Sequence, residues 1–380
     1  MQLVAYGAQD IYLTGNPQIT FFKVVYRRHT NFSMESIQQT WNGAPADLQS
    51  AGRMTATISR NGDLVHKMYL ETDSAFDVDS AGNPGAMLID TVECEIGGQL
   101  IDKHYGHWME AFAELTEPNS AAMLATGGAI ASSVHPTATK FQAMSAMGGV
   151  KAAAGVEGVR QIPLQFWFCR NPGLALPLIA LQYHEVKIIL STTAIAAGGV
   201  PPLWVDYIYL DTDERRRFAQ VSHEYLIEQV QTSTGNTASS GGVSLNFNHP
   251  VKELVWTRPW ASGAFAVFTA GDTWQLKLNG HDRFASRDIS YFTLAQVWQH
   301  HTGTPVVSGG TAGIGQAGHV IGVYSFALKP EEHQPSGTCN FSRIDNAQFC
   351  SSGTDTFTIY AVNYNVLRIM SGMGGLAYSN

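Results

Sequence analysis

With 380 residues the chain is too long for one small domain, and its 44% apolar content suffices for a sizeable core. Only 14% of the residues are charged, against about 25% in an average globular protein, which suits a protein that buries much of its surface against other subunits. The net charge of −8 excludes a protein coated in nucleic acid, so no direct nucleic-acid partner is expected. No apolar run is long enough to predict a membrane span, and MQLVAYGAQD does not resemble a secretory signal.

An aromatic and basic stretch near the N-terminus, QITFFKVVYRRHTNF (18–32), raises the first functional question. It places Phe21, Phe22 and Tyr26 around the basic side chains of Arg27 and Arg28. Three interpretations remain open from these residues alone: a nucleic-acid surface, a membrane-binding face, or the first strand of a larger sheet.

Alternating apolar and polar residues dominate the rest of the chain and recur around glycine-containing turns. The predicted strand–turn–strand segments are RMTATISRNGDLVHKMYLE (53–71), VECEIGGQLID (92–102) and TWQLKLNGHDRF (273–284). Asn61-Gly62 and Asn279-Gly280 favour hairpin turns because both turn positions must tolerate positive φ. Many short strands with frequent turns predict an all-β sandwich or barrel.

The pattern recurs in two halves of the chain. The matched pairs are Leu64-Val65 with Leu254-Val255, the hairpin at Gly98 with the hairpin at Gly280, FWF (166–168) with YSF (324–326), and VDYIYL (205–210) with AVNYNV (361–366). A short helix-like segment with a tryptophan follows each matched hairpin. Four matches in the same order predict two similar domains in tandem.

The first half is longer between its second and third matched segments. Residues 117–160 are rich in Ala, Gly, Ser and Met, with almost no strand pattern. They predict a long exposed loop inserted into the first domain, and a helical segment around 121–126 is the alternative.

The segment DTDERRRFAQ (211–220) predicts a short helix that connects the two halves. Asp211 or Thr212 can cap its N-terminus, acidic residues follow in the first turn, and the arginines Arg215, Arg216 and Arg217 come later, in the order that the helix dipole favours. These arginines are candidate ion-pair or interface residues. A phosphate site is the less favoured interpretation.

Motifs for catalysis or cofactor binding are weak throughout the sequence. The glycine-rich SGMGGLA (371–377) has no following helix to hold a phosphate, and His104 and His107 lack further ligands at zinc-like spacing. The four cysteines are scattered and are predicted to be reduced thiols. The sequence therefore predicts no enzyme activity, no cofactor and no metal.

Several long segments carry a resemblance to a known family. They are GAQDIYLTGNPQITFFKVVYRRHTNF (7–32), RNGDLVHKMYLE (60–71), LPLIALQYHEVKI (176–188), HPVKELVW (249–256), SGTCNFSRID (336–345) and YAVNYNVLRIMSGMGGLAYSN (360–380). The chain resembles the major capsid protein of nucleocytoplasmic large DNA viruses, although residues 117–160 do not match and the chain looks short for the family.

The resemblance implies a double jelly roll, in which each half is an eight-stranded β-sandwich with a few short helices in loops. The implied organisation is an N-terminal arm at the capsomer base (1–18), a first jelly roll (19–210), a linker helix (211–222) and a second jelly roll with a C-terminal tail (223–380). The stretch TFFKVVYRRHT would then be the first strand of the first jelly roll, and Arg27 and Arg28 would bind neighbouring chains or carboxylates.

The implied function is a structural one. Three copies would form a pseudo-hexagonal capsomer that tiles an icosahedral shell, so the expected location is the virion, after synthesis and assembly in the host cytoplasm. The implied partners are the chain itself, neighbouring capsomers, and minor capsid and penton proteins. An internal membrane would lie beneath the shell without the protein being inserted in it.

Two other function classes remain open. A glycan-binding β-sandwich of lectin type would need exposed aromatic residues on the loop at 117–160, which has only Phe141. It is compatible with a capsid protein whose outer loops bind glycans. An enzyme on a β-sandwich scaffold would need titratable residues that converge in a pocket, and the sequence predicts none.

Overall fold

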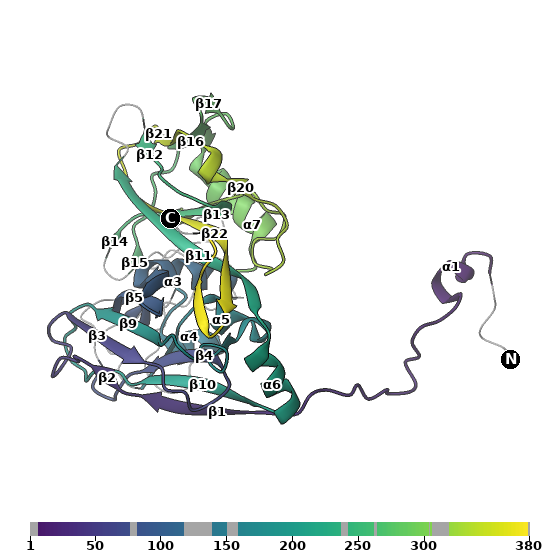
Figure 1. The fold of residues 1–380 in the computed structure, drawn as a ribbon. Coiled ribbons are helices and arrows are strands. Elements are labelled where there is room, and N and C mark those ends of the chain that lie inside the picture. The colour runs from purple at the N-terminus through teal and green to yellow at the C-terminus, as the bar shows by residue number, and fades with distance from the viewer. Residues whose placement is uncertain are drawn as a thin grey trace.

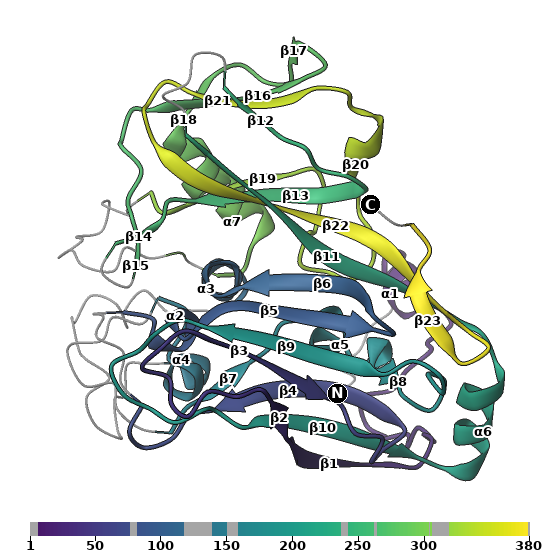
Figure 2. The same cartoon turned by 60° about the vertical axis from the view of Figure 1, so that its left-hand side comes forward.

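The computed structural model describes residues 7–76, 82–117, 139–149, 159–236, 242–261, 264–303, 305 and 319–378. Its body consists of β-sheets stacked as layers in one direction, as Figures 1 and 2 both show. Residues 7–31, which precede the first strand, run away from this body (Figure 1).

The first two layers, called the first roll below, come from the first half of the chain. One sheet has the strand order β1-β10-β4-β7, with β8 beside β4, and the other has the order β2-β3-β9-β5-β6. The bounds are β1 (Phe32–Gln39), β2 (Trp41–Asn42), β3 (Gly52–Thr57), β4 (Leu64–Glu71), β5 (Ile89–Ile96), β6 (Gln99–Tyr105), β7 (Gln161–Pro163), β8 (Leu176–Pro177), β9 (Val186–Thr192) and β10 (Leu203–Leu210).

The next two layers, called the second roll, come from the second half. One sheet has the order β11-β22-β13-β19, with β20 beside β13 and β23 beside β22, and the other has the order β12-β21-β16-β17, with β18 beside β16. The bounds are β11 (His223–Asn236), β12 (Val243–Ser244), β13 (Pro250–Thr257), β14 (Trp260–Ala261), β15 (Ala264–Phe265), β16 (Thr273–Leu278), β17 (His281–Asp282), β18 (Arg287–Asp288), β19 (Ile321–Ser325), β20 (Cys339–Asn340), β21 (Ala347–Ser351), β22 (Thr356–Met370) and β23 (Met373–Leu376).

The two rolls have the same strand order, which is that of a jelly roll. Within each roll the first, eighth, third and sixth main strands form one sheet, and the second, seventh, fourth and fifth form the other. The tandem repeat and the all-β double jelly-roll fold predicted above are therefore confirmed.

Two of the four sequence matches do not hold in detail. Val65 points into the core of the first roll, whereas Val255 points out of the core of the second, so this match is out of register. Residues 166–168 lead into the helix α5 (Trp167–Arg170), whereas 324–326 end the strand β19. The matches of the hairpins and of β10 with β22 do hold.

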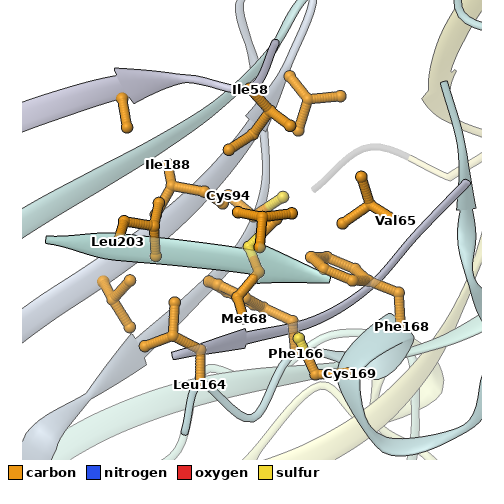
Figure 3. Packing of buried hydrophobic residues seen from close by; sticks show 14 of the residues in the cluster. Ile58, Val65, Met68, Cys94, Leu164, Phe166, Phe168, Cys169, Ile188 and Leu203 are labelled. Carbon is orange, nitrogen blue, oxygen red and sulfur yellow. The ribbon is translucent and has the colours of Figure 1, made fainter. Parts of the chain in front are cut away.

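Each roll has its own hydrophobic core between its two sheets. In the first roll, Met68, Cys94, Ile188 and Leu203 meet from four strands, and the aromatic rings that flank Trp167 close the core from α5 (Figure 3). In the second roll, Trp256 and Trp274 take the equivalent central place, with ring centroids 6.0 Å apart. Burial of side chains of this size, at about 1.5–3 kcal/mol each, is the main force that holds the layers together.

Two of the three predicted hairpins are confirmed. Gly97 and Gly98 join β5 to β6, and Asn279 and Gly280 join β16 to β17, with positive φ at all four positions. The third prediction was wrong, because β3 pairs with β9 and β2, whereas β4 pairs with β10 in the opposite sheet. Gly62 is needed there for space, since a Cβ at this position would lie 2.7 Å from the Cβ of Tyr207.

The helices are short and lie in the connections. They are α1 (Asp10–Thr14), α2 (Pro84–Met87), α3 (Gly106–Thr116), α4 (Lys140–Ser145), α5, α6 (Thr212–Gln220) and α7 (Gln296–His300), with the π-helix η3 (Tyr291–Ala295) leading into α7 and 3-10 turns at η2 (Pro172–Leu174) and η4 (Phe341–Arg343). Helix α6 begins after the predicted cap Asp211, whose carboxylate accepts a hydrogen bond from the Thr212 N–H. None of the helices in the described ranges is long and apolar enough to span a membrane.

The described part of the predicted loop insertion is only partly exposed: Met144 and Val159 are exposed, whereas residues 145–149 are buried. Residues 139–149 form α4 and a turn that packs against the first core through Met147. The buried Glu110 of α3 accepts hydrogen bonds from the N–H groups of Gly148 and Gly149, and burial raises its pKa to about 7. For residues 145–149 the exposed-loop prediction was wrong, because backbone donors to a buried acid hold this turn in place. The alternative helix at 121–126 lies outside the described residues.

The two rolls are joined by a large apolar contact. Helix α3 of the first roll lies on the outer face of the β11-β22-β13-β19 sheet, the face turned away from the core of the second roll (Figure 2). Trp108 of α3 packs there against Tyr360, with ring centroids 5.1 Å apart, and beside Val255. Strand β13 is consequently buried on both faces.

The last strand of the chain returns to the first roll. Gly374 of β23 lies so close to Leu181 that a Cβ on it would come within 2.7 Å of that side chain. His184 Nδ1 contacts the backbone of Gly374, and the Tyr183 N–H donates to the Gly372 carbonyl. The first roll therefore gains contacts from the C-terminal end of the chain.

Candidate assembly surfaces

The segment before β1 is the most exposed part of the described chain. Residues 7–31 contain only the short helix α1, and Phe21, Phe22 and Tyr26 are each nearly fully exposed, with Phe22 at 97%. The prediction that TFFKVVYRRHT forms the first strand was wrong, because regular strand structure begins at Phe32. A strand needs a neighbouring strand to accept its hydrogen bonds, and none of the described strands lies beside this segment.

Arg27 and Arg28 lie in this exposed segment, and no ion pair involving them occurs within the described chain. The segment combines large apolar side chains with positive charge, and apolar clusters of this extent mark contact surfaces. Because Phe32 pairs with Leu210, the base of the segment lies beside the start of α6 at one corner of the molecule (Figure 1).

The arginines of α6 have different environments at that corner. Arg215 donates through Nε to Oδ1 of Asp63 at 2.8 Å, and Oδ2 of the buried Asp63 accepts the Leu210 N–H. Arg215 therefore fastens the linker helix to the first roll. Arg216 and Arg217 are exposed, and Arg217 borders a groove lined also by Phe218 and Tyr225.

A buried charged network fixes the junction of the rolls from within. Glu228 of β11 accepts from Arg170 of α5 at 2.8 Å and from Lys252 of β13 at 2.9 Å, and Lys252 also donates to the Pro330 carbonyl. Each charge is compensated, which matters because an unpaired buried charge costs several kcal/mol. The network links an element of the first roll to two strands of the second.

A second buried ion cluster holds the end of α7. The imidazole of His301 lies 3.0 Å from Glu253 and 3.1 Å from Glu331. Burial opposes its charge, but the two carboxylates outweigh burial and raise the pKa of His301 to about 9. The ring is therefore charged at neutral pH, and it holds the pKa of Glu253 below its usual value despite burial.

The weak metal candidates have structural partners. His104 lies 2.9 Å from the buried carboxylate of Asp102, and His107 contacts the Tyr360 hydroxyl at 2.8 Å. Burial lowers the pKa of His107 to about 4, so this ring is neutral. In the described ranges, no group of three or more His, Cys, Asp or Glu residues could hold a metal ion. The four cysteines form no disulfide with one another among the described residues.

Two jelly rolls stacked head to tail, with extensive uncovered apolar surface, define a structural protein of the shell-forming double jelly-roll class. Two family models match the chain: "Major capsid protein N-terminus" over residues 20–211 and "Large eukaryotic DNA virus major capsid protein" over residues 214–375. The chain therefore belongs to the major capsid protein family of large eukaryotic DNA viruses.

Individual relatives agree with this assignment. The major capsid protein of Pyramimonas orientalis virus is 54% identical, and that of Paramecium bursaria Chlorella virus 1 is 41% identical; each alignment covers 100% of this chain and 99% of the relative. The solved capsid structure of the latter virus, PBCV-1, matches with a TM-score of 0.75 at 36% identity, over 95% of this chain and 100% of that one. The Faustovirus major capsid protein, at 13% identity and a TM-score of 0.65, shares the fold.

The function is accordingly that of a structural capsid protein, and the family does not consist of enzymes. Its place is the virion capsid. The resemblance and the fold predicted from sequence are confirmed. What sequence reasoning missed is the exposure of residues 18–31 and the buried clusters around Glu228 and His301, whose members are far apart in the chain.

Proposed function

We propose that three copies of this chain close into a ring and form a pseudo-hexagonal capsomer that tiles the faces of an icosahedral shell. The observation that carries the proposal is the head-to-tail stack of two rolls with equal strand order. Such a stack has unlike ends, so copies associate through heterologous contacts, which form a closed ring when the rotation between copies is suitable. Six similar rolls then give a trimer a nearly hexagonal outline.

The proposed organisation of the chain is an arm (1–18), a first jelly roll (19–210), a linker helix (211–222) and a second jelly roll (223–380). The position of α6 between β10 and β11 and the separation of the two family matches at 211–214 support this division. The exposed state of residues 18–31 suggests extending the arm up to β1. Assembly in the host cytoplasm, with minor capsid and penton proteins as further partners and glycans at the outer loops, belongs to the same proposal.

The exposed arginines on the segment before β1 and on α6, called the basic corner below, are proposed to act in assembly. Arg27, Arg28, Arg216 and Arg217 are exposed and positive on a chain of net charge −8, so carboxylates of neighbouring copies or minor proteins are fitting partners. Arg215 contributes by holding α6 in place.

The native mass of the purified protein, measured by light scattering on a sizing column, tests the trimer. The expected mass is three times the 41.2 kDa of one chain. A folded protein that stays monomeric at high concentration would contradict self-assembly into a trimer.

The double variant Arg27→Glu with Arg28→Glu tests the basic corner. It is expected to keep the trimer and to lose ordered lattices in electron micrographs, because the arm then repels acidic partners. The matched control, Arg53→Glu with Arg343→Glu, makes the same charge change at exposed positions elsewhere. Normal lattices from the arm variant would remove Arg27 and Arg28 from assembly.

A further inference from the structure

The outer face of the β1-β10-β4-β7 sheet is apolar and is covered at one end only, where Leu64 and Ile208 pack against Ala175 and Phe218. On β1, Phe32 is 54% and Met34 is 49% exposed, and Met34 pairs with Ile208 of β10. On the same face the rings of Tyr69 and Trp204 stack, with centroids 6.5 Å apart and planes within 10° of parallel. Polar residues interrupt the face, as Asp206 lies between Trp204 and Ile208 on β10.

The equivalent face of the second roll is fully covered within the chain. Trp204 pairs with Tyr69, and in the same place of the second roll Tyr360 pairs with Val255. Tyr360 is only 2% exposed because Trp108 of α3 lies on it. The first roll thus supplies the helix that covers the second roll. On the corresponding face of the first roll, within the described residues, Phe218 of α6 reaches only the end at Leu64 and Ile208 and leaves Met34 exposed.

The second roll carries the counterpart of α3. Helix α3 follows the hairpin β5–β6 and precedes β7, and the η3–α7 helix lies in the same place, after β16–β17 and before β19. Its inner side contributes Phe292 and Val297 to the two cores of this region. Its outer side presents Leu294, 46% exposed, and Trp298, 81% exposed, four residues apart and hence on one helix face.

We propose that the outer side of η3–α7 in one copy docks on the outer face of the β1-β10-β4-β7 sheet in the next copy. Leu294 and Trp298 would lie on Met34 and the Tyr69–Trp204 stack, so that each interface between copies repeats the contact that α3 makes within a copy. A tryptophan on an uncovered helix face is the type of residue that dominates interface energies. The proposal rests on the proposed trimer and names the two surfaces that close it.

The two sheet faces differ in composition, as expected if one is covered during folding and the other only during assembly. The face that α3 covers forms once, during folding, and is apolar at Val255, Tyr360 and Val362. The face assigned to the next copy carries Asp206 at the position of Val362. A surface that must remain soluble before assembly needs such polar residues, and interfaces between separately folded chains are accordingly more polar than cores.

A mixing experiment tests the pairing of the two surfaces. Met34→Glu damages the sheet face and leaves the helix intact, whereas Trp298→Glu does the reverse. Each variant alone is expected to elute as a 41.2 kDa monomer. An equal mixture retains one intact helix–sheet pair for every two chains, so a species of twice the monomer mass is expected, and a trimer is not.

The outcomes separate this proposal from the trimer itself. Leu100→Glu is the matched control, since Leu100 is a strand residue with the same 49% exposure as Met34, and it should remain trimeric. A wild-type monomer would contradict the proposed trimer. A wild-type trimer with trimeric Met34→Glu and Trp298→Glu variants would overturn only this proposal. Monomeric variants that give no dimer on mixing would show that the two surfaces do not meet. Circular dichroism spectra like the wild type's verify that the exposed substitutions leave the fold intact.

Discussion

The two rolls share a strand order but differ in how their outer sheet faces are used. In the second roll the sheet around β13 and β22 is buried on both sides, by its own core and by α3. In the first roll the sheet around β1 and β10 is buried on its core side, and its outer side is covered only near Leu64 and Ile208 within the described chain. The same sheet of the fold is therefore enclosed in the second roll and lies at the surface in the first. The strand sequences reflect this, since the enclosed sheet has Val362 where the surface sheet has Asp206.

The largest expected effect comes from exchanging residues between the two faces. Val362→Asp places a carboxylate among apolar groups under α3 and should lower the free energy of unfolding by about 5 kcal/mol, because a buried charge without a partner is poorly tolerated. Asp206→Val makes the opposite change at the equivalent, partly exposed position and should change it by under ~0.5 kcal/mol. Urea unfolding followed by tryptophan fluorescence measures both, and equal effects would remove the distinction between the faces.

The buried network at the junction should give the next largest effect. Lys252→Met removes one of the two charged partners of Glu228 and the donor to the Pro330 carbonyl, and it should cost about 3 kcal/mol in unfolding free energy. The control Arg368→Met removes an exposed ion pair with Glu224 and should cost below ~1 kcal/mol. The same urea titration compares them, and a similar small loss in both variants would mean that the junction does not depend on this charge.

The His301 cluster should make stability depend on pH. The pKa of His301 is raised from 6.5 to about 9, so its contribution is fully present below about pH 6.5 and is lost as pH rises toward 9. The loss should be on the order of 3 kcal/mol between pH 6 and pH 10. Unfolding curves of His301→Gln should lack this part of the pH dependence, and an unchanged profile would exclude His301 as its source.

The sequence predicted the elements that depend on local chemistry. The turns at Gly97-Gly98 and Asn279-Gly280 need positive φ, and the cap at Asp211 needs a side chain that accepts a hydrogen bond, so each leaves a short signature. The Asn61-Gly62 segment has the same signature but joins different sheets. The space occupied by Tyr207 explains Gly62, and that residue is distant in sequence.

The candidate surfaces were harder to predict, because exposure depends on the absence of a partner. Alternation in TFFKVVYRRHT is compatible with a strand, yet a strand forms only where another strand accepts its hydrogen bonds. Trp108 and Trp298 occupy similar helix-like segments, and nothing in those segments distinguishes the buried ring from the exposed one. Trp108 is buried because the second roll of the same chain packs on it, whereas no described residue covers Trp298.

The return of β23 to the first roll has a consequence for protein synthesis. The contacts of Gly372 and Gly374 with Tyr183 and His184 join the first roll to residues that are synthesised much later, since Gly374 follows His184 by 190 positions. The first roll can begin to fold while translation continues, but this clasp closes only after β23 has been synthesised. The first roll therefore completes its contacts only after the strands of the second roll have been translated.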